Sequence, residues 1–187
     1  MKDLNKLSKE IYEANKAKGF HDKEHSVEHM MCLVISELME AVEADRKGRK
    51  ADAECVKALT KRTSKSLFDV LFKNGVKDSV EDELADAVIR LLDTAGALGV
   101  RIKEIEKENN LDYYATIGFF EDHLFTERVI HIIDKYFNSI NTIEWALALM
   151  IFNIEILCEV MDIDLWKHVE LKLKYNSLRP YKHGKKY

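Results

Sequence analysis

Two pairs of acidic residues, each with a spacing of three, are the side chains in this sequence best suited to chemistry. They are Glu37 with Glu40, and Glu83 with Asp86. Residues three apart in a helix lie on one face, about 60° apart around the axis, so both carboxylates of a pair can reach a common point. If the two helices face each other, four carboxylates can converge.

The nearest neighbours of these acids are apolar, which is unusual for carboxylates. Val34 and Leu38 flank the first pair, and Leu84 and Val88 flank the second. At an effective dielectric constant of about 20, two charges about 4 Å apart repel by about 4 kcal/mol, so a buried cluster needs a cation. Oxygen ligands without Cys or His favour a hard divalent ion. The pattern therefore predicts Mg²⁺, with Mn²⁺ as a substitute.

The common alternative for either pair alone is a set of solvent-facing acids on an amphipathic helix. Two pairs on separate helical stretches weaken that interpretation and leave it open. Asp93 follows Asp86 by seven residues, two helical turns along nearly the same face. Asp93 is therefore a candidate fifth metal ligand, or an acid that supports the ligands.

Composition indicates the fold class that must position these acids. The chain has 187 residues, 47% of them hydrophobic, which is enough for one buried core, so we expect a single domain over 1–187. One proline, Pro180, and seven glycines interrupt the chain little, and Leu, Ala, Glu and Lys are abundant. These features favour an all-α fold, a helical bundle.

Hydrophobic periodicity predicts where the helices lie. We expect helices over 3–18, 24–47, 54–73, 80–97, 101–109, 112–137, 142–161 and 164–175. Gly19 and Gly48 are predicted to end the first two. Ser79 is predicted to cap the helix that carries Glu83, with Asp82 as its reciprocal partner. Each acidic pair then falls on its own helix.

Cysteine usage and hydropathy bear on the compartment. Cys32, Cys55 and Cys158 are far apart and form no C-x-x-C pair, which argues against a disulfide framework or a zinc site. The N-terminus has no apolar signal region, and the longest apolar run, 145–152, is too short to span a bilayer. We expect a cytoplasmic protein with no membrane partner.

The net charge of −4 is unevenly distributed. Residues 46–65 carry eight basic residues against two acids, and residues 171–187 carry six basic residues and no acid. An acidic centre between basic segments suits a metal-bridged polyphosphate, whereas a nucleic-acid duplex prefers one continuous basic face. No nucleic-acid partner is expected. The alternatives are a solvated helix face for the first segment and a disordered terminus for the second.

Four motifs occur in order along the chain: Lys-Gly-Phe at 18–20, Ser-Glu-Leu-x-Glu-Ala at 36–41, Asp-Glu-Leu-Ala-Asp at 82–86, and Tyr-Asn-x-x-Arg-Pro-x-x-His-Gly-Lys at 175–185. Together they resemble the MazG-like all-α nucleoside triphosphate pyrophosphohydrolases. The resemblance covers 10–100 and 162–187 and leaves 110–160 without a recognised motif. The stretch between Glu40 and Glu83 is longer than the family pattern usually allows, which indicates an insertion at about 48–78. The basic C-terminal tail is 172–187.

The resemblance implies an enzyme that hydrolyses (d)NTP to (d)NMP and pyrophosphate with Mg²⁺, in nucleotide-pool house-cleaning. It implies Glu37, Glu40, Glu83 and Asp86 as metal ligands and catalytic residues. One glutamate would orient the attacking water as a base, and we assign this role to Glu37. Asp93 stands where many members carry Asn. The implied phosphate contacts are Lys172, Asn176, Arg179 and Lys185. A homodimer or higher homo-oligomer is also implied.

Other side chains and other protein classes offer alternatives to this hypothesis. His21, His25 and His29 follow a helical spacing that suits a base or a metal, but polar helix-face histidines are commoner. Phe20 suits either base stacking or a capping contact. A ferritin-like di-iron bundle needs Glu-x-x-His on two helices, and the sequence contains none. A non-catalytic nucleotide-binding helical regulatory module is the remaining alternative.

Overall fold

The computed structural model describes residues 2–61, 63–108, 110–138 and 142–184. Across these ranges the regular structure is entirely helical, so the expected all-α class is confirmed. The helices are α1 (Leu4–Ala17), α2 (Val27–Arg46), α3 (Ala53–Leu59), α4 (Lys65–Gly75), α5 (Val80–Leu98), α6 (Leu111–Asp122), α7 (Phe125–Asn138), α8 (Ile143–Val160) and α9 (Leu165–Leu178), followed by the 3₁₀ turn η1 (Tyr181–Gly184).

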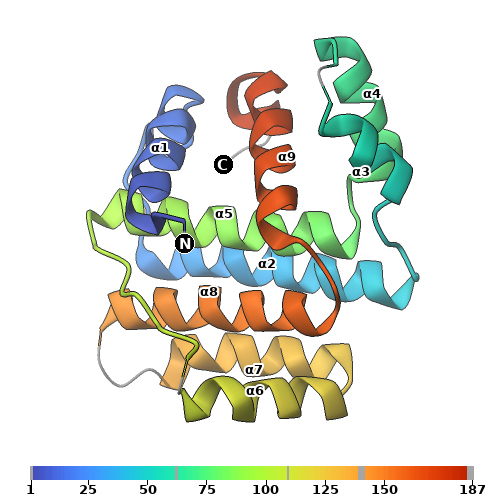
Figure 1. The fold of residues 1–187 in the computed structure, drawn as a ribbon. Coiled ribbons are helices and arrows are strands. Elements are labelled where there is room, and N and C mark those ends of the chain that lie inside the picture. Colours follow the sequence, from blue (N-terminus) through green and yellow to red (C-terminus); the bar gives the residue numbers. More distant parts are fainter. Residues whose placement is uncertain (1, 62, 109, 139–141, 185–187) are drawn as a thin grey trace.

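Helix α5 is the centre of the fold. Figure 1 shows α5, α2, α8, α7 and α6 running side by side, with α1, α9 and the α3–α4 pair standing across them. Helix α5 contacts α1, α2, α8 and α9. Its apolar side chains Leu84, Val88 and Leu91 are fully buried, and each contributes about 1.5–3 kcal/mol of hydrophobic free energy. Polar groups on α5 are therefore drawn into the core with it.

The segment expected to be an insertion, 48–78, forms α3 and α4. Phe68 and Phe72 of α4 are completely buried in a small second core, where they meet Tyr175 of α9. The rings of Phe72 and Tyr175 stack with centroids 4.3 Å apart. The α3–α4 pair thus supports the helix that leads into the basic tail.

The predicted helix ends are confirmed for α1, α2 and α5. Gly19 and Gly48 both have positive φ, and the Ser79 hydroxyl accepts the N–H of Asp82 at 3.2 Å. The predicted reciprocal bond differs, because the Asp82 carboxylate accepts the N–H of Asp78 instead, at 3.0 Å. This carboxylate therefore caps the turn before the helix.

Two predicted helices are each divided in two. The predicted 54–73 helix breaks between Thr60 and Ser64, where Ser64 starts α4 by accepting the N–H of Leu67. The predicted 112–137 helix breaks at His123, whose backbone is extended and whose carbonyl accepts a bond from Arg128 Nε at 2.7 Å. Local side-chain bonds to the backbone compete with helix continuation in both places.

The predicted helix over 101–109 is wrong. Residues 100–107 have no helical structure, and Asn5 bonds both backbone groups of Ile102, at 2.9 Å to its N–H and 3.2 Å to its carbonyl. These bonds come from a residue 97 positions earlier in the chain, so the local charge pattern could not reveal them.

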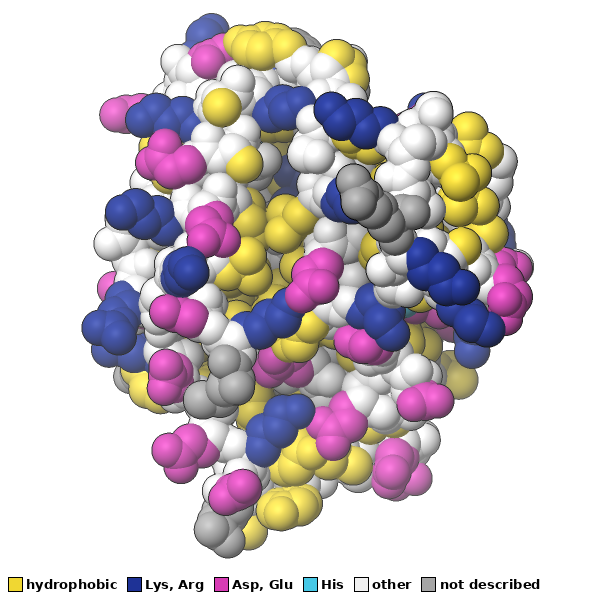
Figure 2. All heavy atoms as spheres, turned by 45° about the horizontal axis from the view of Figure 1, so that its top comes forward, with side chains coloured by type: hydrophobic (Ala, Val, Ile, Leu, Met, Phe, Trp, Pro, Cys, Tyr) yellow, Lys and Arg dark blue, Asp and Glu magenta, His cyan; other side chains and the backbone are white. Residues whose placement is uncertain are grey.

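The surface mixes both signs of charge. Figure 2 shows Lys and Arg interspersed with Asp and Glu on the face it presents, with hydrophobic side chains visible in a hollow between them. Several large apolar side chains are exposed on α6 and α7, among them Tyr114, Ile130 and Phe137. Within the described part of the chain, no helix has the length and hydropathy needed to cross a membrane.

Candidate metal centre

Three of the four predicted acids meet between α2 and α5. Glu37 of α2 and Glu83 and Asp86 of α5 each offer an oxygen, and these oxygens all lie within 4.8 Å of one another. The two helices pack through their apolar faces, where Leu38 and Leu84 are fully buried. Acids at the same level of both faces are therefore brought together, in an arrangement able to hold a metal ion.

Burial dominates the electrostatics of Glu37 and Glu83. It raises the pKa of Glu37, and the charge of Asp86 adds to the effect, while Arg90 opposes it. Burial also raises the pKa of Glu83 to about 9, against the attraction of Lys172. Both shifts mean that ionising this cluster costs free energy, and a bound cation would reverse that cost.

Two basic side chains lie within the acidic cluster. Arg90 Nε donates to Glu37, and Lys172 Nζ lies 2.7 Å from Asp82 and 3.1 Å from Asp86. Burial alone would lower the pKa of Lys172, but the carboxylates of Asp86 and Asp82 outweigh it and raise this pKa above its ordinary value. The protein therefore offsets part of the repulsion with its own cations.

Arg90 was not among the predicted site residues. It follows Asp86 by four residues and Glu83 by seven, so it lies on the acidic face of α5. This spacing was the signal in the sequence that could have identified it.

The donor set fits a hard divalent ion. The three converging ligands are all carboxylates, and the buried Oδ1 of neighbouring Asp82 has no hydrogen-bond partner among the described residues. A second group, formed by Asp78, Asp82 and Glu83, also has oxygens close enough for a metal. There, however, the Oδ2 atom of Asp82 already accepts bonds from Lys172 and the Asp78 N–H. Glu37 and Asp86 of the first group are also bonded to basic side chains, so these bonds do not separate the two groups. The first group is the one that joins predicted ligands of both α2 and α5.

Glu40 and Asp93 lie apart from this group. Glu40 is exposed, and its Oε1 is 3.5 Å from the Ser36 hydroxyl. Asp93 is half-buried and pairs with His21, whose Nε2 lies 2.9 Å and 3.1 Å from its two oxygens. The structure thus brings three of the predicted metal ligands together and leaves these two outside the group.

A cavity of about 70 Å³ adjoins the acids and is lined by residues of α1, α2, α5 and α9. Asp86, Asp93, Asn176 and Arg179 line it together, so two predicted phosphate contacts face the same space as a predicted metal ligand. Lys172 lies instead in the buried ion pairs with Asp82 and Asp86. Lys185, the fourth predicted phosphate contact, falls outside the described residues.

Aromatic rings form another wall of this cavity. Phe20, His21, His25 and His29 all line it. The rings of His25 and His29 stack with centroids 4.5 Å apart. Burial lowers the pKa of His29, and the nearby charges of His25 and Arg90 act in the same direction, which favours a neutral ring.

Bonds to the end of α1 hold the end of α9 beside this cavity. Lys18 Nζ donates to the carbonyls of Ser177, at 3.1 Å, and Arg179. The N–H of Lys182 donates to the Lys18 carbonyl at 2.9 Å, and the Tyr181 hydroxyl donates to Asp22. The first and last motifs of the sequence are thus in direct contact.

The fold and the site define an all-helical protein with a candidate acidic metal centre. Comparisons with models of known protein families, with curated proteins and with solved structures found no match for this chain.

Proposed function

We propose that this protein is a Mg²⁺-dependent nucleoside triphosphate pyrophosphohydrolase that converts (d)NTP to (d)NMP and pyrophosphate. The observation that carries the proposal is that Glu37, Glu83 and Asp86 converge beside a cavity lined by Asn176 and Arg179. Carboxylates and a guanidinium at one site are the groups that metal-assisted phosphoryl chemistry requires.

The acids have distinct roles in this proposal. Glu37, Glu83 and Asp86 would hold the ion, which when bound supplies charge neutralisation and a more acidic water. Glu37 would also orient the attacking water. Arg90 donates to its carboxylate and holds it in place.

The end of α9 would bind the phosphates. Arg179 can form two parallel bonds to phosphate oxygens, and the Asn176 amide can donate to a third. The aromatic wall of Phe20, His25 and His29 offers flat surfaces on which a nucleobase can stack. The cavity of about 70 Å³ is smaller than a nucleoside triphosphate, so the substrate would lie partly outside it and extend from the acids towards the start of α2.

The test is pyrophosphate release from a panel of canonical and damaged nucleoside triphosphates with Mg²⁺. Glu83→Gln and Asp86→Asn are expected to abolish release, because each removes a ligand charge. Glu121→Gln is the matched control, since Glu121 is exposed on α6 and lines no part of the cavity. Equal turnover in the wild type and both site variants would refute the proposal. Release of orthophosphate would indicate another reaction class.

A non-catalytic nucleotide-binding module is the second candidate. It is favoured by the bonds of Arg90 and Lys172, which satisfy several carboxylate oxygens without any metal. In that case a nucleotide would bind with equal affinity in EDTA and in Mg²⁺, and no pyrophosphate would be released.

A further inference from the structure

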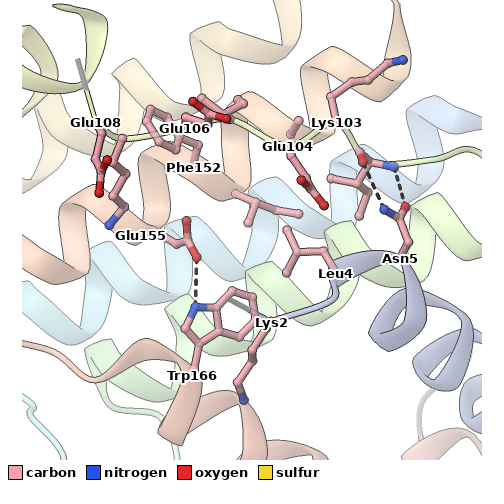
Figure 3. A pocket seen from close by; sticks show the side chains of 15 residues that line it. Lys2, Leu4, Asn5, Lys103, Glu104, Glu106, Glu108, Phe152, Glu155 and Trp166 are labelled. Carbon is pink, nitrogen blue, oxygen red and sulfur yellow. Dashed lines mark hydrogen bonds between the residues drawn. The ribbon is translucent and has the colours of Figure 1, made fainter. Parts of the chain in front are cut away.

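A second, larger cavity of about 830 Å³ lies between the N-terminal residues, the segment 102–108, α8 and the start of α9 (Figure 3). Its volume is within the range of about 300–1,000 Å³ typical of small-molecule sites. It shares no lining residue with the cavity beside the acids. The proposed hydrolysis therefore assigns it no role.

The floor of this cavity is apolar. The apolar lining residues include Leu4, Ala148, Ile151 and Phe152. The indole of Trp166 lies at one side (Figure 3). Such a floor can cover methylene groups or a ring, but it gives a ligand no polar anchor. The polar anchor must come from the few charged residues around it.

One carboxylate lies within the apolar wall. Glu155 of α8 accepts a hydrogen bond from Trp166 Nε1 at 2.9 Å. Among the described residues, its side chain accepts no other hydrogen bond. No ion pair within those residues includes Glu155. Burial raises its pKa, while the Trp166 bond and the charge of Lys107 oppose the rise. A cationic ligand group in the cavity would give this carboxylate a direct ionic partner.

Three more carboxylates form the rim. Glu104, Glu106 and Glu108 alternate along the non-helical segment and are all exposed. The two bonds from Asn5 to Ile102 hold the start of this segment in place. The rim therefore presents repeated negative charge along one edge of the cavity.

The lysines around the cavity are engaged elsewhere. Lys2 pairs with Glu170, and Lys107 pairs with Glu159 at 2.8 Å, while Lys103 points away from the cavity in Figure 3. The Lys2 ammonium also lies 5.4 Å from the centre of the Trp166 ring, so this indole already accepts a cation over its face. Four carboxylates line the cavity against three lysines, and two of these lysines form ion pairs with acids that do not line it.

We propose that this cavity binds a linear aliphatic polyamine. One ammonium group would bond to Glu155 beside the Trp166 indole, the methylene chain would lie on the apolar floor, and the outer ammonium groups would face the rim glutamates. A neutral apolar ligand would bring no positive charge to the four carboxylates, and an anion would be repelled by them. The proposal is independent of the hydrolytic function.

The test is calorimetric titration of the full chain with spermidine at fixed ionic strength. Glu155→Gln keeps the shape and the acceptor for Trp166 but removes the charge, and it is expected to weaken binding about tenfold, the size of one charged hydrogen bond. Glu121→Gln, on α6, is the matched control and should bind as the wild type does. Helical circular dichroism checks that each variant is folded.

A second variant changes only exposed residues, so that a loss of spermidine binding cannot result from disturbing a buried side chain. Replacement of Glu104, Glu106 and Glu108 together by Gln should also weaken spermidine binding, with a smaller dependence on salt than the wild type shows. Unchanged affinity in both Glu155→Gln and the rim variant would overturn the proposal. Equal affinity for the compact trivalent ion hexaamminecobalt(III), or for uncharged 1,8-octanediol, would also overturn it, because neither has a charged aliphatic chain.

Discussion

The ring of Tyr181 lies against the backbone of Gly19, in the space that a Cβ at Gly19 would occupy. Gly19 has φ +83°, a conformation that residues with a side chain rarely adopt. The contact joins the turn after α1 to η1, and Arg179, two residues before Tyr181, lines the cavity beside the acids. A glycine is thus required at this point for two independent reasons.

Replacement of Gly19 by alanine should displace Tyr181 as well as strain the backbone. Gly48→Ala is the matched control, because Gly48 also has positive φ but a Cβ there would meet no atom within 4 Å. Strain alone should cost about 1–2 kcal/mol in each variant. Gly19→Ala should lose more, and amide hydrogen exchange over 181–184 should rise only in that variant. Equal losses would mean that the Tyr181 contact contributes nothing.

Removal of the Lys172 ammonium should be severely destabilising. Lys172 is 4% exposed and contacts Asp82 and Asp86, so Lys172→Met leaves two carboxylates without their cation. The expected loss is about 3–5 kcal/mol in urea unfolding. The double variant Lys172→Met with Asp82→Asn should recover part of it. Lys73→Met, which removes an exposed ion pair with Asp69, is the control and should change little.

Divalent metal should stabilise the folded protein through the three converging acids. With Mg²⁺ at 100 times its dissociation constant, the gain in free energy of unfolding is about 2.7 kcal/mol. Glu83→Gln should remove this gain, whereas in EDTA it should be about as stable as the wild type, because the raised pKa of Glu83, about 9, already leaves this side chain uncharged at neutral pH when no metal is bound. The measurement is thermal unfolding in Mg²⁺ and in EDTA. A wild type that unfolds identically in both would contradict the metal centre.

Glu40→Gln tests whether Glu40 is a metal ligand, as the sequence motif implies, or lies outside the metal site, as the structure indicates. The family resemblance implies that Glu40 is a ligand, whereas the structure leaves it exposed and outside the group of three. We expect Glu40→Gln to reduce pyrophosphate release less than Asp86→Asn does. A loss as complete as that of Asp86→Asn would show that Glu40 reaches the ion when substrate is bound.

His168 should make the protein sensitive to acid. It is buried, its Nδ1 has no hydrogen-bond partner among the described residues, and burial lowers its pKa below the ordinary value of 6.5. The native state therefore binds fewer protons than the unfolded state. The stability that His168 contributes is present above pH 6.5 and is lost as the pH falls below that value. His168→Gln should reduce the slope of unfolding free energy between pH 7 and pH 5, and an unchanged slope would assign the loss to other groups.

Local patterns were sufficient to predict most helices and their ends. The periodicity of α1, α2, α5 and α8, the Ser79 cap and the glycine stops all depend on residues within a few positions of one another. The same local spacing placed Glu37, Glu83 and Asp86 on faces able to meet. The extended segment 100–107 was missed because Asn5 holds it from a distant part of the chain.

The partners of the charged groups depended on how the helices pack. Glu37 meets Arg90 across α2 and α5, Asp82 meets Lys172 across α5 and α9, and Asp93 meets His21 beyond the end of α1. Composition and spacing show which side chains lie on one face of a helix, but they do not show which of these side chains are buried side by side. The packing of the apolar helix faces decides which charged side chains are buried next to one another. Each buried charge is then stabilised by the opposite charge that this packing places beside it, because an unpaired buried charge is costly.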